Sequence, residues 1–185
     1  SEGDLIELAD LAAELEGCRI LTPRKEPLSK VLDKTETLRL AEECGIEVPQ
    51  SWQPMASEDF AECAKGLSYP VVLKWADVNS AQPLLDAAGI DLLKAEFIGD
   101  ASGLAAALAR YMSIQCWPLV QSYAAGHGVG HMIYMEAGRS TLCFQHERLH
   151  EWPPEGGVST LCQSLNPLGF PEQMAKSEAL LRAMD

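Results

Sequence analysis

The stretch YPVVLKW, residues 69–75, decides how this chain is expected to fold. A proline opens it, an apolar run with two valines follows, and one lysine interrupts that run, which is typical of a buried strand. Helical and extended patterns alternate around it, from residue 52 to residue 123. We therefore predict mixed α and β structure here. The lysine, Lys74, needs an explanation, because a buried ammonium group must be paired or pay a desolvation cost.

The flanking sequence adds further helices and an antiparallel hairpin. The other expected elements are helices at 4–16, from Pro27, at 35–45 with Thr35 as its cap, at 57–67, 81–89, 100–112 and 171–185, and strands at 18–21, 92–99, 117–123 and 131–152. The stretch 131–152 is expected to form two strands joined by a turn at Ala137-Gly138. The stretch 158–166 is ambiguous.

Composition excludes several classes of partner. The 185 residues carry a formal net charge of -13, so nonspecific binding to nucleic acid is disfavoured. No stretch is long and apolar enough for a membrane span, and the acidic start is unlike a signal peptide. The six cysteines include no C-x-x-C pair, which fits free thiols in a reducing cytoplasm.

The stretch HERLH, residues 146–150, spells H-E-x-x-H, the zinc-protease signature. That motif needs a helix to bring both histidines to one metal, whereas the preceding residues alternate as a strand. On a strand the histidines stand roughly 13 Å apart, too far for one zinc ion. His146, Arg148 and His150 would then share one face, and such a row suits a phosphate better than a metal.

Four separated pieces together resemble ATP-grasp domains of the carbamoyl-phosphate-synthase-like and carboxylate–amine-ligase-like kind. They are DKTETLRLAEECGIEVPQSW (33–52), YPVVLKW (69–75), PLVQSYAAGHGVG (118–130) and FQHERLHEWPPEGGVST (144–160). The resemblance implies an incomplete α+β fold of two α/β lobes with mixed or antiparallel sheets. Residues 1–32 would end a preceding domain, 33–123 would form the small lobe, and 124–185 would begin the large lobe.

The resemblance also implies roles for individual residues. Lys34 and Lys74 would contact nucleotide phosphates, Val120, Gln121, Ser122 and Tyr123 would hold adenine, the loop glycines Gly126 and Gly128 would approach the phosphates, and Arg148 would steady a phosphate or acyl phosphate as the catalytic residue. Each has an ordinary alternative: a solvated lysine, a lysine emerging at a strand end, a core strand, a hairpin loop, and an arginine paired with Glu136 or Glu155.

The chain departs from the family pattern in three places. ADVNSAQPLLDAAG, 76–89, replaces the Gly-rich loop that often follows the lysine strand, and Ser122 stands where the family often has Glu. The acidic and Asn ligands for Mg²⁺, in a pattern like E-x-N, are not found. We therefore assign no metal ligand in the chain, expect the ligands beyond Asp185, and predict that this piece alone lacks turnover.

The leading hypothesis is the ATP-binding core of an ATP-dependent carboxylate–amine ligase that acts through an acyl phosphate, with MgATP, a small carboxylate and an amine as partners. The alternative is a nonenzymatic nucleotide-binding or interaction module whose site has decayed, and a zinc peptidase is the third. No nucleic acid or membrane partner is expected, and the sequence leaves a homodimer open.

Overall fold

The computed structural model describes residues 2–15, 17–18, 20–154 and 156–185 and shows an α+β protein. Its elements are α1 (Glu2–Leu11), α2 (Lys25–Leu32), α3 (Lys34–Glu43), β1 (Ser51–Trp52), α4 (Phe60–Lys65), β2 (Val71–Lys74), α5 (Val78–Ala88), β3 (Glu96–Ile98), α6 (Ala101–Ala109), β4 (Leu119–Ser122), β5 (Val129–Glu136), β6 (Arg139–Trp152), β7 (Val158–Leu165), the 3₁₀ helix η1 (Pro167–Gly169) and α7 (Pro171–Met184). The chain divides into two compact units. The first comprises Ser1–Leu38 and Val48–Tyr123, and the second comprises Arg39–Glu47 and Ala124–Asp185.

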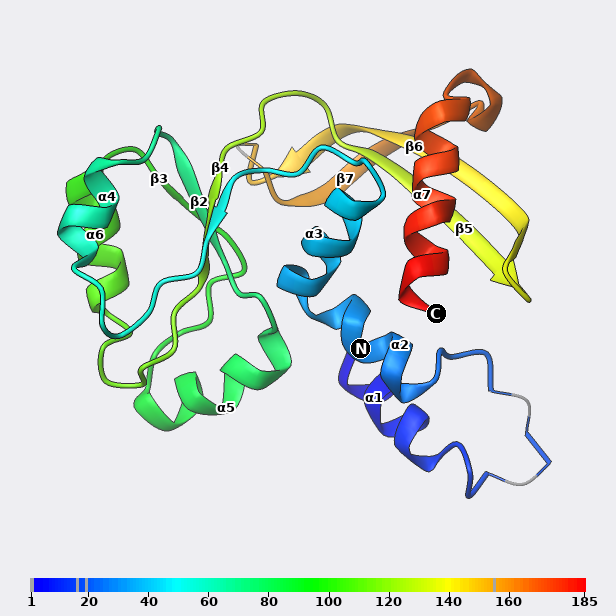
Figure 1. Ribbon diagram of the computed structural model, residues 1–185, viewed down its shortest axis with the longest axis horizontal. Coiled ribbons are helices and arrows are strands. Elements are labelled where there is room, and N and C mark those ends of the chain that lie inside the picture. The colour runs from blue at the N-terminus through cyan, green and yellow to red at the C-terminus, as the bar shows by residue number, and fades with distance from the viewer. Residues whose placement is uncertain (1, 16, 19, 155) are drawn as a thin grey trace. The chain divides into compact units, whose positions relative to one another are not determined.

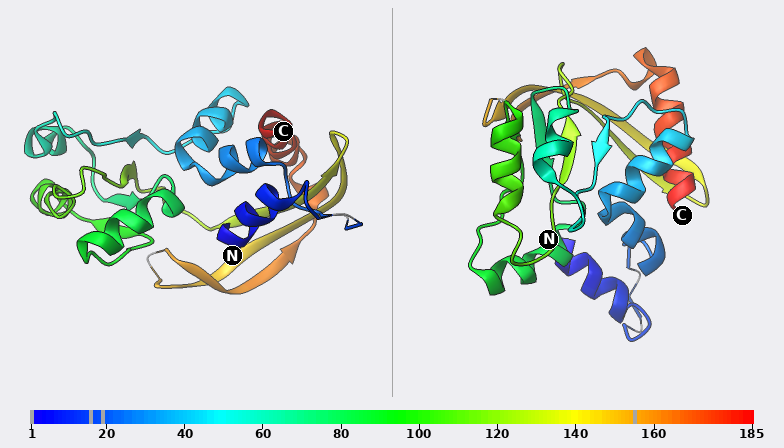
Figure 2. Two further views of the ribbon diagram at one scale, coloured as in Figure 1. Left: turned by 90° about the horizontal axis from the view of Figure 1, so that it is seen from below. Right: turned by 60° about the vertical axis from the view of Figure 1, so that its left-hand side comes forward.

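The first unit is built on an antiparallel sheet with the strand order β1-β4-β2-β3. Helices α4 and α6 lie side by side and cover one face of it (Figure 1, Figure 2). Val71 and Leu73 of β2 face this layer and pack with Leu104 and Leu108 of α6 in the hydrophobic core. The continuous apolar run of β2 therefore forms a central, buried strand, as the sequence predicted.

Helix α5 directly follows the lysine strand. The sequence pattern placed its start at residue 81, but it begins at Val78 because the Asp77 carboxylate caps it, accepting a hydrogen bond from the Asn79 amide at 2.8 Å. Gly89 ends the helix in the left-handed conformation, with φ of 66°. Leu85 of α5 is fully buried in the core of the first unit.

Two predicted strands of the first unit are wrong in whole or in part. Cys18, Ile20 and Leu21 have irregular backbone, and Arg19 lies outside the described residues. Leu21 is 70% exposed, so this short apolar run has no sheet to join. Of the strand expected at 92–99, only Glu96–Ile98 pairs, with β2.

The second unit contains an antiparallel sheet with the order β5-β6-β7. Strands β5 and β6 form the predicted hairpin, and its turn residues Ala137 and Gly138 have φ of 51° and 73°, as a type I′ turn requires. Most of the ambiguous stretch 158–166 forms strand β7, Val158–Leu165, which pairs with β6.

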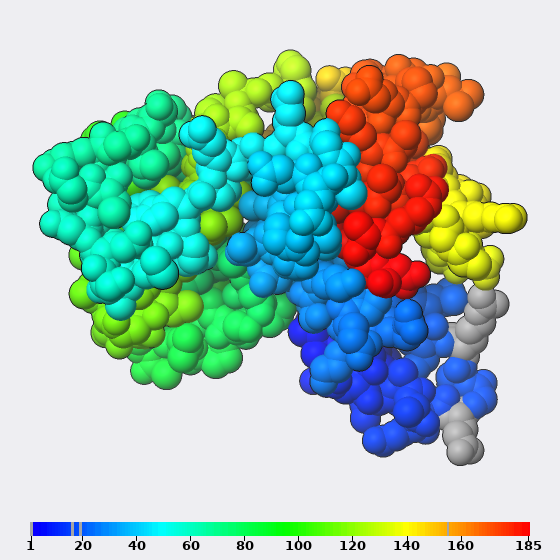
Figure 3. Space-filling view, in the orientation of Figure 1, coloured from blue at the N-terminus to red at the C-terminus, as the bar shows by residue number. Residues whose placement is uncertain are grey.

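Helix α7 packs against the β5–β6 hairpin of the same unit. His131 Nδ1 lies 2.7 Å from Ser177 Oγ, and Arg182 donates to the Gly138 carbonyl oxygen at 3.0 Å. The segment η1–α7 forms the orange-to-red surface of Figure 3. Among the described residues, no helix combines the length and apolarity that a bilayer crossing needs.

Candidate functional site

Lys74 is the last residue of β2, and its side chain is half-buried. Because Val71 and Leu73 face the core beneath α4 and α6, the alternation of a strand places Val72 and Lys74 on the opposite face. Val72, two residues before Lys74 on the same face, is only 4% exposed. Lys74 is therefore a cation at the end of a buried strand, on the sheet face that the two helices leave uncovered.

A backbone hydrogen bond places Lys34 near the end of the lysine strand. Its amide donates a hydrogen bond of 2.9 Å to the carbonyl oxygen of Ala76, which lies two residues beyond Lys74. The Asp33 carboxylate accepts from the amide of Thr35 at 2.8 Å, so Asp33 caps α3 and the sequence assignment of that cap to Thr35 is wrong. The cap fixes Lys34 as the first residue of the helix. The backbone of Lys34 therefore lies next to residue 76, two residues after Lys74, although the two lysines are far apart in the sequence.

Neither lysine is neutralised by a carboxylate within the described part of the chain. Both side chains are half-buried, and the chain as a whole is strongly acidic. Half-buried ammonium groups without a carboxylate partner attract an anion. This part of the first unit is therefore a candidate anion site.

Strand β4 carries the residues predicted to hold adenine, Val120 to Tyr123. It lies between β1 and β2, and Val120 and Gln121 are buried. The amides of Ser122 and Tyr123 already donate to the carbonyl oxygens of Gln50 and Pro70, at 2.8 and 3.2 Å. The next residue, Ala124, is the first whose amide has no backbone acceptor in the described chain. Sequence reasoning missed it because nothing local shows that β4 is paired on both edges.

The segment after the lysine strand presents a carboxylate. Burial of Asp77 tends to raise its pKa, but hydrogen bonds from Ser80 and Asn79 outweigh burial and hold the pKa below its ordinary value. Asp77 is therefore charged at neutral pH and already occupies the amides at the start of α5. Residues 76–89, which follow the lysine strand, form this cap and α5, where many ATP-grasp domains have a Gly-rich loop.

In the second unit, HERLH lies within strand β6, as predicted, so the zinc-protease geometry is absent. The Arg148 side chain packs against Gly128, since a Cβ at Gly128 would lie 2.8 Å from Arg148 Cδ. The amide of Arg148 also donates to the Gly128 carbonyl oxygen at 2.7 Å. Gly128 of the predicted loop and Arg148 are thus brought together, whereas a Cβ at Gly126 would meet nothing within 4 Å.

The predicted row of His146, Arg148 and His150 is wrong at its third member. The pairing of β6 with β7 shifts register between Arg148 and His150, which is a β-bulge. Glu151 takes the place beside Arg148, with Oε1 3.0 Å from Nη1. Arg148 therefore pairs with Glu151, and not with Glu136 as one alternative had it. The other alternative partner, Glu155, lies outside the described residues.

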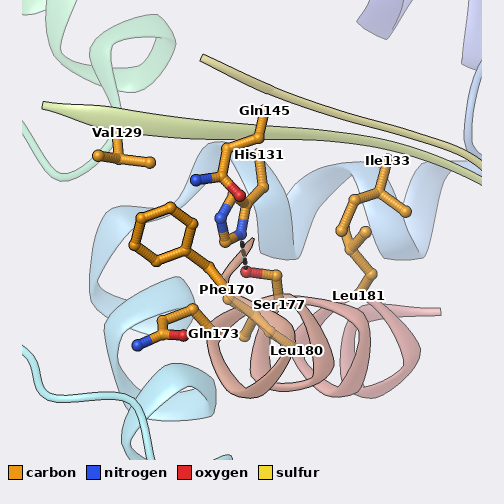
Figure 4. Close-up of a pocket in the computed structure, with 9 residues that line it drawn as sticks. All are labelled: Val129, His131, Ile133, Gln145, Phe170, Gln173, Ser177, Leu180 and Leu181. Atoms are coloured by element: carbon orange, nitrogen blue, oxygen red, sulfur yellow. Dashed lines mark hydrogen bonds between the residues drawn. The ribbon is translucent and has the colours of Figure 1, made fainter. Parts of the chain in front are cut away.

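A pocket of about 550 Å³ lies on the other face of this sheet, between β5, β6 and α7. Figure 4 shows Gln145 and His131 pointing from the strands toward Phe170, Ser177 and the leucines of α7. None of the predicted site residues lines it. Gln145 is 0% exposed, and both polar atoms of its carboxamide lack a hydrogen-bond partner in the described chain.

Replacing Gln145 by leucine is expected to stabilise the protein by about 1 kcal/mol, because a buried amide without partners costs more than an apolar side chain of similar size. Urea denaturation followed by circular dichroism would measure the change. Gln163→Leu is the matched control, since that exposed amide donates to Glu147 at 3.2 Å and its loss should bring no gain. A clear destabilisation by Gln145→Leu would show that the carboxamide has a bound partner.

No family model matches the chain, and a search of the curated proteins finds no match. Solved structures do match. The L-amino acid ligase of Bacillus licheniformis superposes with a TM-score of 0.64 at 12% identity, over 100% of this chain and 40% of that one. The D-alanine–D-alanine ligase of Bacillus anthracis, in complex with ATP, gives 0.57 at 18% identity, over 87% and 47%. The phosphoribosylglycinamide synthetase of Anaerococcus prevotii gives 0.58 at 10% identity, over 100% and 43%.

The chain has an ATP-grasp fold. It spans less than half the length of these three proteins. The predicted fold class, an incomplete ATP-grasp-like α+β arrangement with antiparallel sheets, is confirmed. At these identities the likeness concerns the fold alone, so the function of individual residues rests on the geometry above.

Mg²⁺ is the metal that an ATP-grasp fold implies. Among the described residues, no three His, Cys, Asp or Glu side chains come together in a group that could hold a metal ion. The described residues therefore offer no such ligand group for Mg²⁺.

Proposed function

We propose that the chain is the ATP-binding core of an ATP-dependent carboxylate–amine ligase. In the reaction of the whole protein, a carboxylate oxygen attacks the γ-phosphorus of ATP, giving an acyl phosphate and ADP. The amine nitrogen then attacks the acyl carbon, and phosphate leaves as the amide forms. The observation that carries the proposal is the 2.9 Å hydrogen bond from the Lys34 amide to the Ala76 carbonyl oxygen. It places the backbone of Lys34 beside residue 76, two residues after Lys74.

Each predicted residue has a separate task in this proposal. Lys34 and Lys74 supply positive charge to the phosphates, where ionised hydrogen bonds are strong. The extended segment that ends at Tyr123 offers carbonyl oxygens to adenine, and the free amide of Ala124 supplies the donor that Ser122 and Tyr123 cannot. Arg148 supplies charge in place before the acyl phosphate forms. Residues 1–32 remain proposed as the end of a preceding domain.

The second candidate function is a nucleotide-binding module without catalysis. A specific observation favours it: Asp77 places a charged carboxylate at the start of α5, three residues after Lys74. A triphosphate near Lys74 would be repelled by that carboxylate, which lowers the strength of any phosphate site. This reading keeps the lysines as nucleotide contacts and removes only the turnover.

Isothermal titration of the chain with ATP and with GTP tests the proposal. Saturable binding of ATP is expected, with a dissociation constant between about 1 µM and 1 mM, the usual range for enzyme substrates. Binding of ATP should be tighter than that of GTP, because the donor and acceptor proposed for adenine do not match guanine. If ATP binds no better than GTP, the proposed adenine contacts are refuted. If neither nucleotide binds below about 1 mM, the ATP-binding core itself is refuted.

A further inference from the structure

The imidazole of His146 is held on both sides within the second unit. A Cβ at Gly130 would lie 2.3 Å from its Cε1 and 2.8 Å from its Nε2, so the ring rests on the bare backbone of β5. On the same strand, the Phe144 ring stacks with it, with centroids 6.1 Å apart and an interplanar angle of 22°. His146 is half-buried. The ring therefore has a fixed orientation.

The two nitrogens of this ring are in different surroundings. Nδ1 is buried and has no hydrogen-bond partner in the described chain. A neutral imidazole carries one proton, and that proton is better placed on the nitrogen that can reach a partner. Nε2 is not among the buried, unpartnered atoms. With the proton on Nε2, the ring can donate to a ligand.

Arg148 lies two residues further along β6, on the same face as His146. Its guanidinium uses Nη1 for Glu151, while Gly128 leaves room for its stem. The remaining N–H groups of this rigid fork are available to a ligand. Gly128, just before β5, and Gly130, within β5, thus each lie against one of two donor side chains, Arg148 and His146.

We propose that His146 and Arg148 together form an oxyanion subsite, which narrows the row expected from HERLH to these two residues and makes His146 a further binding residue. The ligand group is an oxygen of a phosphoryl group or of a carboxylate. Both are ligand groups of the proposed ligase, and the inference rests on that function. His146 donates from Nε2, and Arg148 donates from the part of its guanidinium that Glu151 does not occupy.

The HERLH motif supplies its own matched control. His150 is exposed, and the bulge between Arg148 and His150 places Glu151, instead of His150, beside Arg148. His146→Phe keeps a ring to stack on Phe144 and to cover Gly130, but it has no donor. His150→Phe changes the same residue type at the position that the subsite does not use.

Isothermal titrations with ATP and with inorganic pyrophosphate test the inference. His146→Phe should weaken the binding of both about 5- to 10-fold, the effect of one lost hydrogen bond to a charged group, whereas His150→Phe should leave both unchanged. Equal effects of the two variants, or no effect of His146→Phe on any probe, would overturn the subsite. If the unmodified chain binds no ATP, the proposed function fails first and the subsite with it.

Nuclear magnetic resonance titrations identify the oxyanion. The imidazole signal that His146→Phe removes should shift when pyrophosphate or acetate is added. A shift with pyrophosphate assigns the subsite to the nucleotide phosphates, and a shift with acetate alone assigns it to the carboxylate substrate. In the latter case the His146→Phe loss should appear for acetate and not for ATP. No shift with either probe would contradict the subsite.

Gly130→Ala gives a second test that keeps the histidine. The new Cβ would displace the ring, so pyrophosphate or acetate binding should fall as in His146→Phe. Gly169→Ala, in the same unit, is the control because its Cβ would meet nothing within 4 Å. Thermal unfolding checks that both variants are folded. Unchanged binding in a folded Gly130→Ala variant would contradict the requirement for a fixed ring.

Discussion

Replacing Lys74 by alanine should lower the affinity for ATP about 10- to 100-fold, because a charged hydrogen bond to phosphate contributes about 1.5–3 kcal/mol. The loss should be specific to binding. Lys74 pairs with no carboxylate in the described residues, so its removal leaves no uncompensated charge behind. The free energy of unfolding should therefore change little. Isothermal titration measures the affinity, and urea denaturation measures the stability.

Lys94→Ala is the matched control for this result. Lys94 is an exposed lysine just before β3, in the same unit, and it has no proposed contact with the nucleotide. Lys34→Ala should resemble Lys74→Ala, since the two residues share one place through the Ala76 hydrogen bond. Equal losses for Lys94 and Lys74 would indicate a nonspecific charge effect. An unaltered affinity in Lys74→Ala would remove Lys74 from the site.

Replacing Leu85 by alanine should destabilise the first unit by about 3 kcal/mol, the combined effect of lost apolar burial and a cavity. Leu85 is 0% exposed and belongs to the core formed by α4, α5, α6 and the sheet. Tryptophan fluorescence during urea denaturation reports on this unit, because Trp75 and Trp117 are buried in it.

Leu84→Ala provides the control on the same helix. Leu84 is 44% exposed, so its truncation should cost less than about 1 kcal/mol. A similar cost for the two leucines would mean that α5 is not packed as described. The comparison also separates stability from binding, because neither leucine is part of the nucleotide site.

The strands and helices that the sequence predicted best are those with one dominant pattern. Strand β2 follows from a short apolar run, and the β5–β6 hairpin follows from alternation around Ala137-Gly138. The strand at 18–21 failed because an apolar run also needs a neighbouring strand. The start of helix α5 was predicted three residues too late, because the Asp77 cap was not taken into account.

The details of the candidate site depend on contacts between distant residues. Glu96 of β3, for example, forms an ion pair with Arg110, which directly follows α6. The bulge that replaces His150 by Glu151 depends on the register with β7, which no local pattern states. The choice of Lys34 and Lys74 came from the resemblance to ATP-grasp domains. Their adjacent backbones came only from the fold.

The central claim is that Lys34 and Lys74 contact the phosphates of one ATP molecule. An acyl phosphate of ATP tests it directly, because a lysine amine close to the phosphates attacks the acyl carbon and keeps the acyl group as an amide, while ATP leaves. Mass spectrometry of the labelled protein should find the acyl group on Lys34 and Lys74, with Lys65 and Lys94 unlabelled and with protection by excess ATP. Labelling confined to other lysines, or unaffected by ATP, would contradict the claim.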